Sequence, residues 1–227
     1  MSKKKNIITI DGPAGVGKST VSRMVAAATG FTYLDTGAMY RGVGLFLQEE
    51  GVDLTDLQAI EILLQQLDLQ LLPATGQSTD VGVLINNRDV SAEIRTPAMA
   101  MVASNVSAIS VVRDYLTSMQ RSYGERGQIV GEGRDIGTVV FPSAAFKFFL
   151  DARPEERARR RYSQLKDKGI DADLEEILSM TLTRDKNDSE REIAPLVQAE
   201  DASRIDTTEI SVDEVVSLIL QKVKKGL

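Results

Sequence analysis

Short apolar runs alternate with amphipathic segments along most of the chain, which is the pattern of an α/β protein. Residues 7–10 form a β-branched apolar run that ends at Asp11-Gly12, and this is typical of a buried central strand. Similar runs predict strands at residues 31–34, 128–130, 145–150 and 203–206. Amphipathic segments predict helices over residues 19–29, 38–48, 154–168, 174–187 and 211–225. We therefore expect a parallel sheet flanked by helices.

The alternation is interrupted between about residues 52 and 97. A helix is expected over residues 56–67, and two strand-like runs follow at 68–72 and 81–85. Asn86-Asn87-Arg88-Asp89 has the composition of a turn after the second run. Thr96-Pro97 predicts a new helix start with proline at the first position, and helical segments continue to about Tyr123. We interpret the interruption as a small insertion with antiparallel strand pairing.

Local patterns predict how two of the helices end or begin. The helix over residues 19–29 should end at Gly30. Its expected buried face consists of Val21, Met24, Val25 and Ala28. Ser211 and Glu214 have the spacing of a capping box, which predicts the start of the last helix.

Composition narrows the possible chemistry. The chain has 227 residues, of which 42% are hydrophobic, enough for one sizeable core. It contains no Cys and no His, which excludes disulfides, thiol nucleophiles, imidazole catalysis and His-ligated metals. A formal net charge of −6 is not typical of a protein that coats nucleic acid. The apolar runs are too short for a signal peptide or a membrane span, so we expect a cytoplasmic protein.

The turn after the first predicted strand carries the most specific motif. Residues 12–19 read Gly-Pro-Ala-Gly-Val-Gly-Lys-Ser and match G-x-x-x-x-G-K-[S/T] between a predicted strand and a predicted helix. Backbone N–H groups of such a P-loop bind phosphates, Lys18 would reach the β- and γ-phosphates, and Ser19 would hold Mg²⁺. The residues expected to bind the ATP phosphates are Gly12, Ala14, Gly15, Val16, Gly17, Lys18, Ser19 and Thr20.

Arginines recur where other strands end. Arg41 and Arg134 follow the second and third strands of the predicted sheet, at the same edge as the P-loop. Further arginines occur at positions 157, 159, 160, 161, 184 and 191. Guanidinium groups bind phosphate bidentately and stay charged, so these residues suit two phosphate-bearing ligands. The alternative for residues 157–161 is an ordinary solvated helix face.

The chain resembles the bacterial cytidylate kinases, a family of nucleoside monophosphate kinases, over essentially its whole length. Beyond the P-loop, the motifs that carry the resemblance are residues 35–41, 93–96, 133–138, 156–161 and 184–195. The resemblance implies a P-loop NTPase fold with a core of residues 1–51, 98–152 and 188–227. It also implies a monophosphate-site insertion at about 52–97 and a helical lid at about 153–187. The chain departs from the family pattern at Glu132, where Asp is more usual.

The resemblance assigns roles to individual residues. Tyr40, Arg41, Arg134 and Arg191 would hold the acceptor phosphate, while Ser104, Arg113 and Asp135 would bind cytosine. Arg184 and Asp188 would contact the ribose, and Thr36 would also lie in the acceptor site. Lid residues Arg157, Arg160 and Arg161 would close over ATP. The expected catalytic residues are Lys18, Arg134, Arg157 and Arg161.

The implied reaction is ATP-dependent phosphorylation of CMP and dCMP by a monomer that binds only small molecules, with Mg²⁺. A kinase for another acceptor, such as UMP, AMP or a shikimate-like compound, is an alternative. Outside the kinases, a GTPase-type switch and a non-catalytic ATP-binding module would also use a P-loop. The chain lacks the N-K-x-D and D-x-x-G motifs that a GTPase switch uses, and an ATP-binding module would not need a second set of arginines.

Overall fold

A computed structural model describes residues 6–73 and 80–226, and the chain divides into two compact units. Unit 1 comprises Met1–Tyr33 and Arg126–Leu227, and unit 2 comprises Leu34–Glu125. Among the described residues, no helix is long and apolar enough to cross a membrane.

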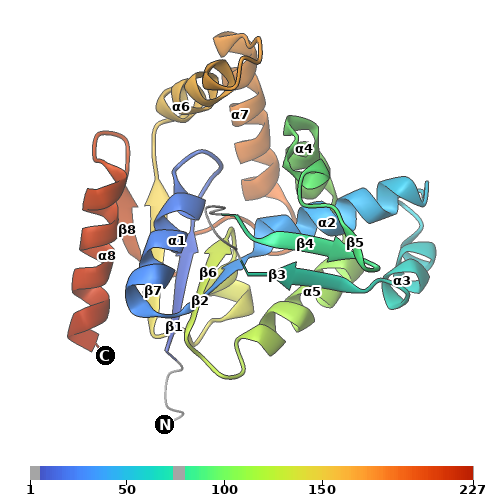
Figure 1. Ribbon diagram of the computed structural model, residues 1–227, viewed down its shortest axis with the longest axis horizontal. Coiled ribbons are helices and arrows are strands. Elements are labelled where there is room, and N and C mark those ends of the chain that lie inside the picture. The colour runs from blue at the N-terminus through green and yellow to red at the C-terminus, as the bar shows by residue number, and fades with distance from the viewer. Residues whose placement is uncertain (1–5, 74–79, 227) are drawn as a thin grey trace. The chain divides into compact units, whose positions relative to one another are not determined.

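Unit 1 is built on a five-stranded sheet (Figure 1). Its strands, in spatial order, are β2 (Thr32–Asp35), β6 (Ile129–Gly133), β1 (Ile7–Asp11), β7 (Phe146–Asp151) and β8 (Ser203–Asp206). The pairs β1–β6, β1–β7 and β7–β8 are parallel, and β1 occupies the centre of the sheet. These strands confirm the expected α/β fold, and all five were predicted within a few residues of their observed bounds. The carboxyl end of β1, where the P-loop begins, is therefore the middle of the sheet edge.

Helices α1 (Lys18–Thr29) and α8 (Val212–Gly226) pack on one face of this sheet (Figure 1). Paired residues of neighbouring strands share a face, and Ile8, Ile10 and Phe148 form one core with these helices. The buried face of α1 was only half predicted. Val21 and Val25 are buried, but Ser22 and Ala26 complete the stripe, while Met24 and Ala28 are exposed. Gly30 ends α1 in the left-handed conformation, as expected.

Helices α6 (Pro154–Asp167) and α7 (Leu174–Glu190) form a hairpin with a small core of its own. Ala158, Leu165 and Ile177 are its buried residues, and Tyr162 and Leu178 pack against them. Both helices were predicted from the sequence. This core holds the two helices against each other.

A π-helical turn, η2 (Ile136–Val140), follows β6 and was not predicted. Asp11, the last residue of β1, accepts hydrogen bonds from the backbone N–H groups of Ile136 and Gly137, at 2.9 and 2.8 Å. A Cβ on Gly137 would lie 2.7 Å from Thr9 Oγ1, so the turn packs closely against β1. The carboxylate of Asp11 thus fixes the loop that carries Arg134 and Asp135.

Unit 2 combines helices with a small antiparallel sheet. Its helices are α2 (Thr36–Glu49), α3 (Leu57–Gln65), the 3₁₀ turn η1 (Glu93–Arg95), α4 (Pro97–Val106) and α5 (Ser110–Tyr123). Its strands are β3 (Leu69–Leu72), β4 (Gly82–Ile85) and β5 (Arg88–Asp89), in that spatial order. The expected antiparallel pairing is confirmed between β3 and β4.

The predicted turn after β4 is shorter than expected. Asn86 and Asn87 have φ of 49° and 65°, as the central residues of a tight hairpin require, whereas Arg88 and Asp89 pair with β4 as a strand. Arg88 also forms ion pairs with Glu49 and Glu93. Pro97 opens α4 as predicted, although Thr96 makes no side-chain cap hydrogen bond.

The capping box of α8 gives a test of the fold. Ser211 N donates to Glu214 Oε2 at 2.8 Å, and Glu214 N donates to Ser211 Oγ at 3.3 Å. Since Ala cannot accept that bond, Ser211→Ala should lower the melting temperature by about 2–4 °C. Ser179→Ala, at an exposed position within α7, is the control and should not lower it. Equal melting temperatures for wild type and Ser211→Ala would show that the box does not stabilise α8.

Candidate active site

The P-loop connects β1 to α1 through three glycines with positive φ. Gly12, Gly15 and Gly17 have φ of 148°, 81° and 93°. At Gly12 a Cβ would lie 2.0 Å from the carbonyl oxygen of Leu150, so no other residue fits there without moving the backbone of β7. The loop therefore passes tightly over the centre of the sheet before α1 begins.

The start of α1 fits a bound polyphosphate. Gly17 precedes the helix, so no side chain caps it, and the first turn contains no acidic residue. The first N–H groups of a helix lack internal partners and attract anions. Ser19 and Thr20 are exposed in this turn, and Ser19 would offer its hydroxyl to a Mg²⁺ carried by the phosphates. ATP and Mg²⁺ are thus compatible with the groups present.

Lys18 lies under the P-loop with 7% of its surface exposed. Its Nζ donates a hydrogen bond to the carbonyl oxygen of Pro13 at 2.6 Å. Burial lowers the pKa of Lys18 well below its usual value, and the positive charges of Arg134 and Arg184 lower it further. Glu132 and Asp11 act in the opposite direction, so these two carboxylates help keep the lysine protonated.

Five predicted acceptor-site residues come together in unit 1, as two groups of ion pairs. Arg134 Nε lies 2.7 Å from Asp188 Oδ2, and Arg184 Nε lies 3.9 Å from the same oxygen. Arg191 NH2 lies 3.4 Å from Asp135 Oδ1. Asp135 and Asp188 are buried, so each carboxylate has the cationic partner that burial demands.

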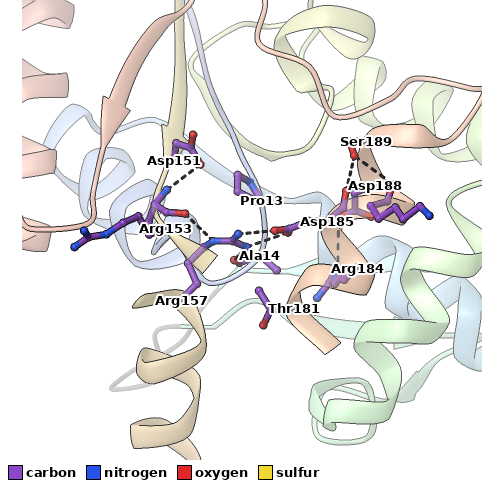
Figure 2. Close-up of polar contacts among 12 residues, drawn as sticks. Pro13, Ala14, Asp151, Arg153, Arg157, Thr181, Arg184, Asp185, Asp188 and Ser189 are labelled. Carbon is purple, nitrogen blue, oxygen red and sulfur yellow. Dashed lines mark hydrogen bonds and ion pairs between the residues drawn. The ribbon is translucent and has the colours of Figure 1, made fainter. Parts of the chain in front are cut away.

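Arg157 joins the hairpin of α6 and α7 to the P-loop (Figure 2). Its side chain is 3% exposed, and its guanidinium donates to Asp185 Oδ1 of α7 at 2.9 Å. It also donates to the carbonyl oxygens of Ala152 and Ala14, at 2.9 and 3.1 Å. A Cβ on Gly15 would lie 3.0 Å from that of Arg157. Arg157 therefore packs against the P-loop at Ala14 and Gly15 and is not part of a solvated helix face.

The other two predicted lid arginines lie on the same helix. Arg160 donates to the carbonyl oxygen and the hydroxyl of Thr207, and to Glu156 Oε1 at 3.2 Å. Thr207 in turn donates to the carbonyl oxygen of Val16 at 3.2 Å, so Arg160 reaches the P-loop through one intermediate residue. Arg161 is partly buried.

Unit 2 contains the remaining five predicted residues. Arg41 NH2 lies 3.5 Å from Asp35 Oδ2, and Asp35 caps α2 by accepting from Ala38 N at 2.8 Å. The Arg113 guanidinium lies 5.8 Å from the ring centroid of Tyr40, in cation–π geometry. Thr36 is the first residue of α2. Ser104 lies near the end of α4 and is buried. Its carbonyl oxygen accepts a hydrogen bond from Ser107 Oγ at 2.7 Å. Arg113 NH1 donates to the Ser107 carbonyl oxygen at 3.1 Å, which connects α5 to the end of α4.

Sequence reasoning missed several residues that organise the site. Asp11, Asp185 and Thr207 each hold a loop or an arginine beside the P-loop. Asp11 could have been suspected from its place at the end of a buried strand, but Asp185 and Thr207 occur in sequence contexts without a signal. A hollow of about 370 Å³ beside Pro13, lined also by Arg157, Asp185 and Asp206, was not predicted either.

This fold and this site define a P-loop nucleotide-binding protein. The cytidylate kinase family model matches residues 8–225. The cytidylate kinase of Carboxydothermus hydrogenoformans is 48% identical over 215 residues, covering 94% of this chain and 95% of that protein. The cytidylate kinase of Thermosipho melanesiensis is 47% identical over 218 residues, 96% of each chain. The chain belongs to the cytidylate kinase family.

A solved structure supports the fold independently. An uncharacterized protein from Eubacterium ventriosum has a TM-score of 0.52 to this chain at 13% identity, covering 96% of this chain and 98% of that one.

Asp11 predicts a specific pH dependence of stability. Burial raises its pKa from 3.8 to about 6, against the lowering effect of the N–H groups of Gly137 and Ile136. The unfolded chain therefore releases this proton at lower pH than the folded chain. The stability that Asp11 contributes is present below pH 3.8 and is lost as the pH rises through 6, by about 3 kcal/mol for about two pKa units.

Urea unfolding of wild type and Asp11→Asn between pH 4 and 7 tests this expectation. Wild type should lose stability relative to the variant as the pH rises. Asp206→Asn is the control, because hydrogen bonds from Thr208 lower the pKa of Asp206 below 3.8, and the stability it contributes is already present above that pH. In that comparison the relative stability should change little over the same range. A difference between wild type and Asp11→Asn that does not change with pH would contradict the raised pKa.

Proposed function

We propose that the protein transfers a phosphoryl group from ATP, with Mg²⁺, to CMP and dCMP, and so forms ADP and CDP or dCDP. Membership of the cytidylate kinase family supports this activity. The structural observation that carries it is a second set of arginines outside the P-loop. Arg41, Arg134 and Arg191 are each held beside a carboxylate, which suits a second phosphate-bearing ligand better than a lone ATP.

We assign these arginines to the acceptor phosphate, together with Tyr40. Each guanidinium is oriented by its carboxylate partner, Asp35, Asp188 or Asp135, and a phosphate dianion would compete for the same N–H groups. A phosphate dianion offers more charge and more acceptor oxygens than one carboxylate. Replacement of the carboxylate by the phosphate of a monoester as the partner of each guanidinium is therefore favourable. Thr36, at the first position of α2, would add its N–H or hydroxyl to this set.

Recognition of cytosine is assigned to Arg113, Ser104 and Asp135. Cytosine presents an N4 amino donor beside the N3 and O2 acceptors, so a carboxylate or hydroxyl suits the first and a guanidinium the others. Arg113 is buried, and its orientation is fixed by the Tyr40 ring and the Ser107 carbonyl oxygen. Uracil has a carbonyl oxygen in place of the amino group and would have no hydrogen there to donate to the Asp135 carboxylate. Arg184 and Asp188 would contact the ribose hydroxyls.

The transfer itself needs no general base. The acceptor phosphate is mostly a dianion near neutral pH, because its second pKa is about 6. ATP bound with Mg²⁺ supplies the phosphoryl group in an activated form. What remains for the chain is positioning and charge neutralisation, which agrees with a site that has no His.

Lys18 would neutralise charge on the β- and γ-phosphates, and Arg134 would do so on the acceptor side. Arg157 and Arg161 would act from the lid, with Arg160 as a further ATP contact. Arg157 links Asp185 of the hairpin to Ala14 of the P-loop, so a movement of α6 and α7 would be coupled to the phosphate-binding loop. Closure of the hairpin would also exclude water, which competes as a phosphoryl acceptor.

The activity is tested by following ADP formation from ATP and Mg²⁺ with CMP, dCMP, UMP, AMP and GMP at equal concentrations. Turnover should be strong with CMP and dCMP and weak with the others, because only cytosine matches the proposed donors and acceptors. A preference for another base would agree with a nucleoside monophosphate kinase but would refute the assignment of Ser104, Arg113 and Asp135 to cytosine recognition. If no acceptor increased ADP formation, the proposed function would be wrong.

Arg41→Ala should raise the KM for CMP about tenfold or more and change the KM for ATP much less, since the residue is assigned to the acceptor alone. Arg88→Ala is a matched control in the same unit, because Arg88 pairs with Glu49 and Glu93 on the exposed surface. The control should leave both KM values unchanged. Equal effects of Arg41→Ala on the two KM values would refute the assignment.

A further inference from the structure

We propose that Tyr33 is a positioning residue for phosphoryl transfer, because its phenol donates a hydrogen bond to Glu132 and fixes that carboxylate at the start of α1. The proposal rests on the proposed function and adds to it a pair of residues, 99 positions apart in the chain, that no motif connects. Tyr33 lies in β2, at one edge of the sheet, and Glu132 lies near the end of the neighbouring strand β6.

The register of the sheet gives the direction of Glu132. It pairs with Ile10 of β1, and paired residues of parallel strands share a face. Ile10 belongs to the core beneath α1 and α8, and Tyr33 packs against the same core. Glu132 is therefore on the α1 face of the sheet, close to the edge from which the P-loop emerges. Its charge acts on Lys18, the first residue of α1.

Burial makes the hydrogen bond to Tyr33 important. Glu132 is 4% exposed, and an ionised carboxylate in such a place is stable only with hydrogen-bond donors and positive charge around it. The Tyr33 hydroxyl donates to Glu132 Oε1, and the ring of Tyr33 is fixed by its packing in the core. A carboxylate with a rigid donor has fewer accessible rotamers, so its charge stays at one place relative to Lys18.

The position of this charge matters because Lys18 has competing neighbours. The positive charges of Arg134 and Arg184 repel its ammonium group, whereas the carboxylates of Glu132 and Asp11 attract it. Both oxygens of Asp11 already accept hydrogen bonds from backbone N–H groups of η2, so the position of this carboxylate is fixed by that turn. Glu132 is the carboxylate on the α1 face, and Tyr33 keeps it there. Displacement of Glu132 would disturb the lysine during transfer and would not touch the groups assigned to CMP.

A double-mutant cycle with Tyr33→Phe and Glu132→Gln tests the proposal, with the acceptor that the wild-type enzyme turns over. Tyr33→Phe removes one oxygen and should lower kcat about tenfold with the KM for CMP unchanged. Adding Tyr33→Phe to Glu132→Gln should lower kcat no further, because the hydroxyl acts through the carboxylate. Tyr115→Phe is the control, since that phenol donates to the Leu67 carbonyl oxygen of unit 2 at 3.0 Å, and kcat should not change.

Urea unfolding of the same four proteins provides a readout that does not depend on activity. The two substitutions should be coupled in their unfolding midpoints, because Tyr33→Phe removes the donor of this hydrogen bond and Glu132→Gln removes the negative charge of its acceptor. Coupling in the midpoints with unchanged kcat would show a purely structural contact and would overturn the proposal. Absence of coupling in both kcat and the unfolding midpoint would show that Tyr33 and Glu132 do not interact, and would also overturn the proposal. If the wild type turned over no monophosphate, the proposed function would fail while the unfolding cycle still reported on the Tyr33–Glu132 bond.

Discussion

The connection between β1 and α1 must be made almost without side chains, and the arrangement of the site follows from this constraint. At Gly12 a Cβ would overlap the carbonyl oxygen of Leu150, and Gly12, Gly15 and Gly17 all have positive φ. The loop can therefore stay close to the sheet and leave the first N–H groups of α1 uncapped. That creates a positive field at the centre of the sheet edge, and Lys18 is buried beneath it.

Much of this could be predicted from the sequence, because the signals are local. The apolar runs identified the strands of the sheet, and the P-loop motif, Gly30 and the Ser211–Glu214 box identified helix ends. Predictions failed where tertiary packing decides. Met24 and Ala28 satisfy helical spacing as well as Ser22 and Ala26 do, and only the position of the sheet selects the second pair. Similarly, Arg88 and Asp89 have turn composition but pair with β4.

For the site, residue identities were predictable but their partners were not. The arginines stood out by type and by position after strands, and the family resemblance supplied their roles. Nothing in the sequence connects Arg157 to Asp185, or Tyr33 to Glu132, because these pairs depend on which segments the fold brings together. Local patterns report on neighbours three or four residues away, whereas buried charge is neutralised by residues far along the chain.

Those partners explain how a chain with net charge −6 can hold a concentrated group of buried cations. Lys18 and Arg157 are nearly inaccessible to solvent and would be costly to bury alone. Each is balanced by carboxylates of the same unit: Asp11 and Glu132 act on Lys18, and Asp185 pairs with Arg157. The carboxylates lower the cost of burial and orient the cations before any phosphate arrives. Less reorganisation is then needed when charge develops during transfer, and this is the condition under which fixed electrostatic groups catalyse most effectively.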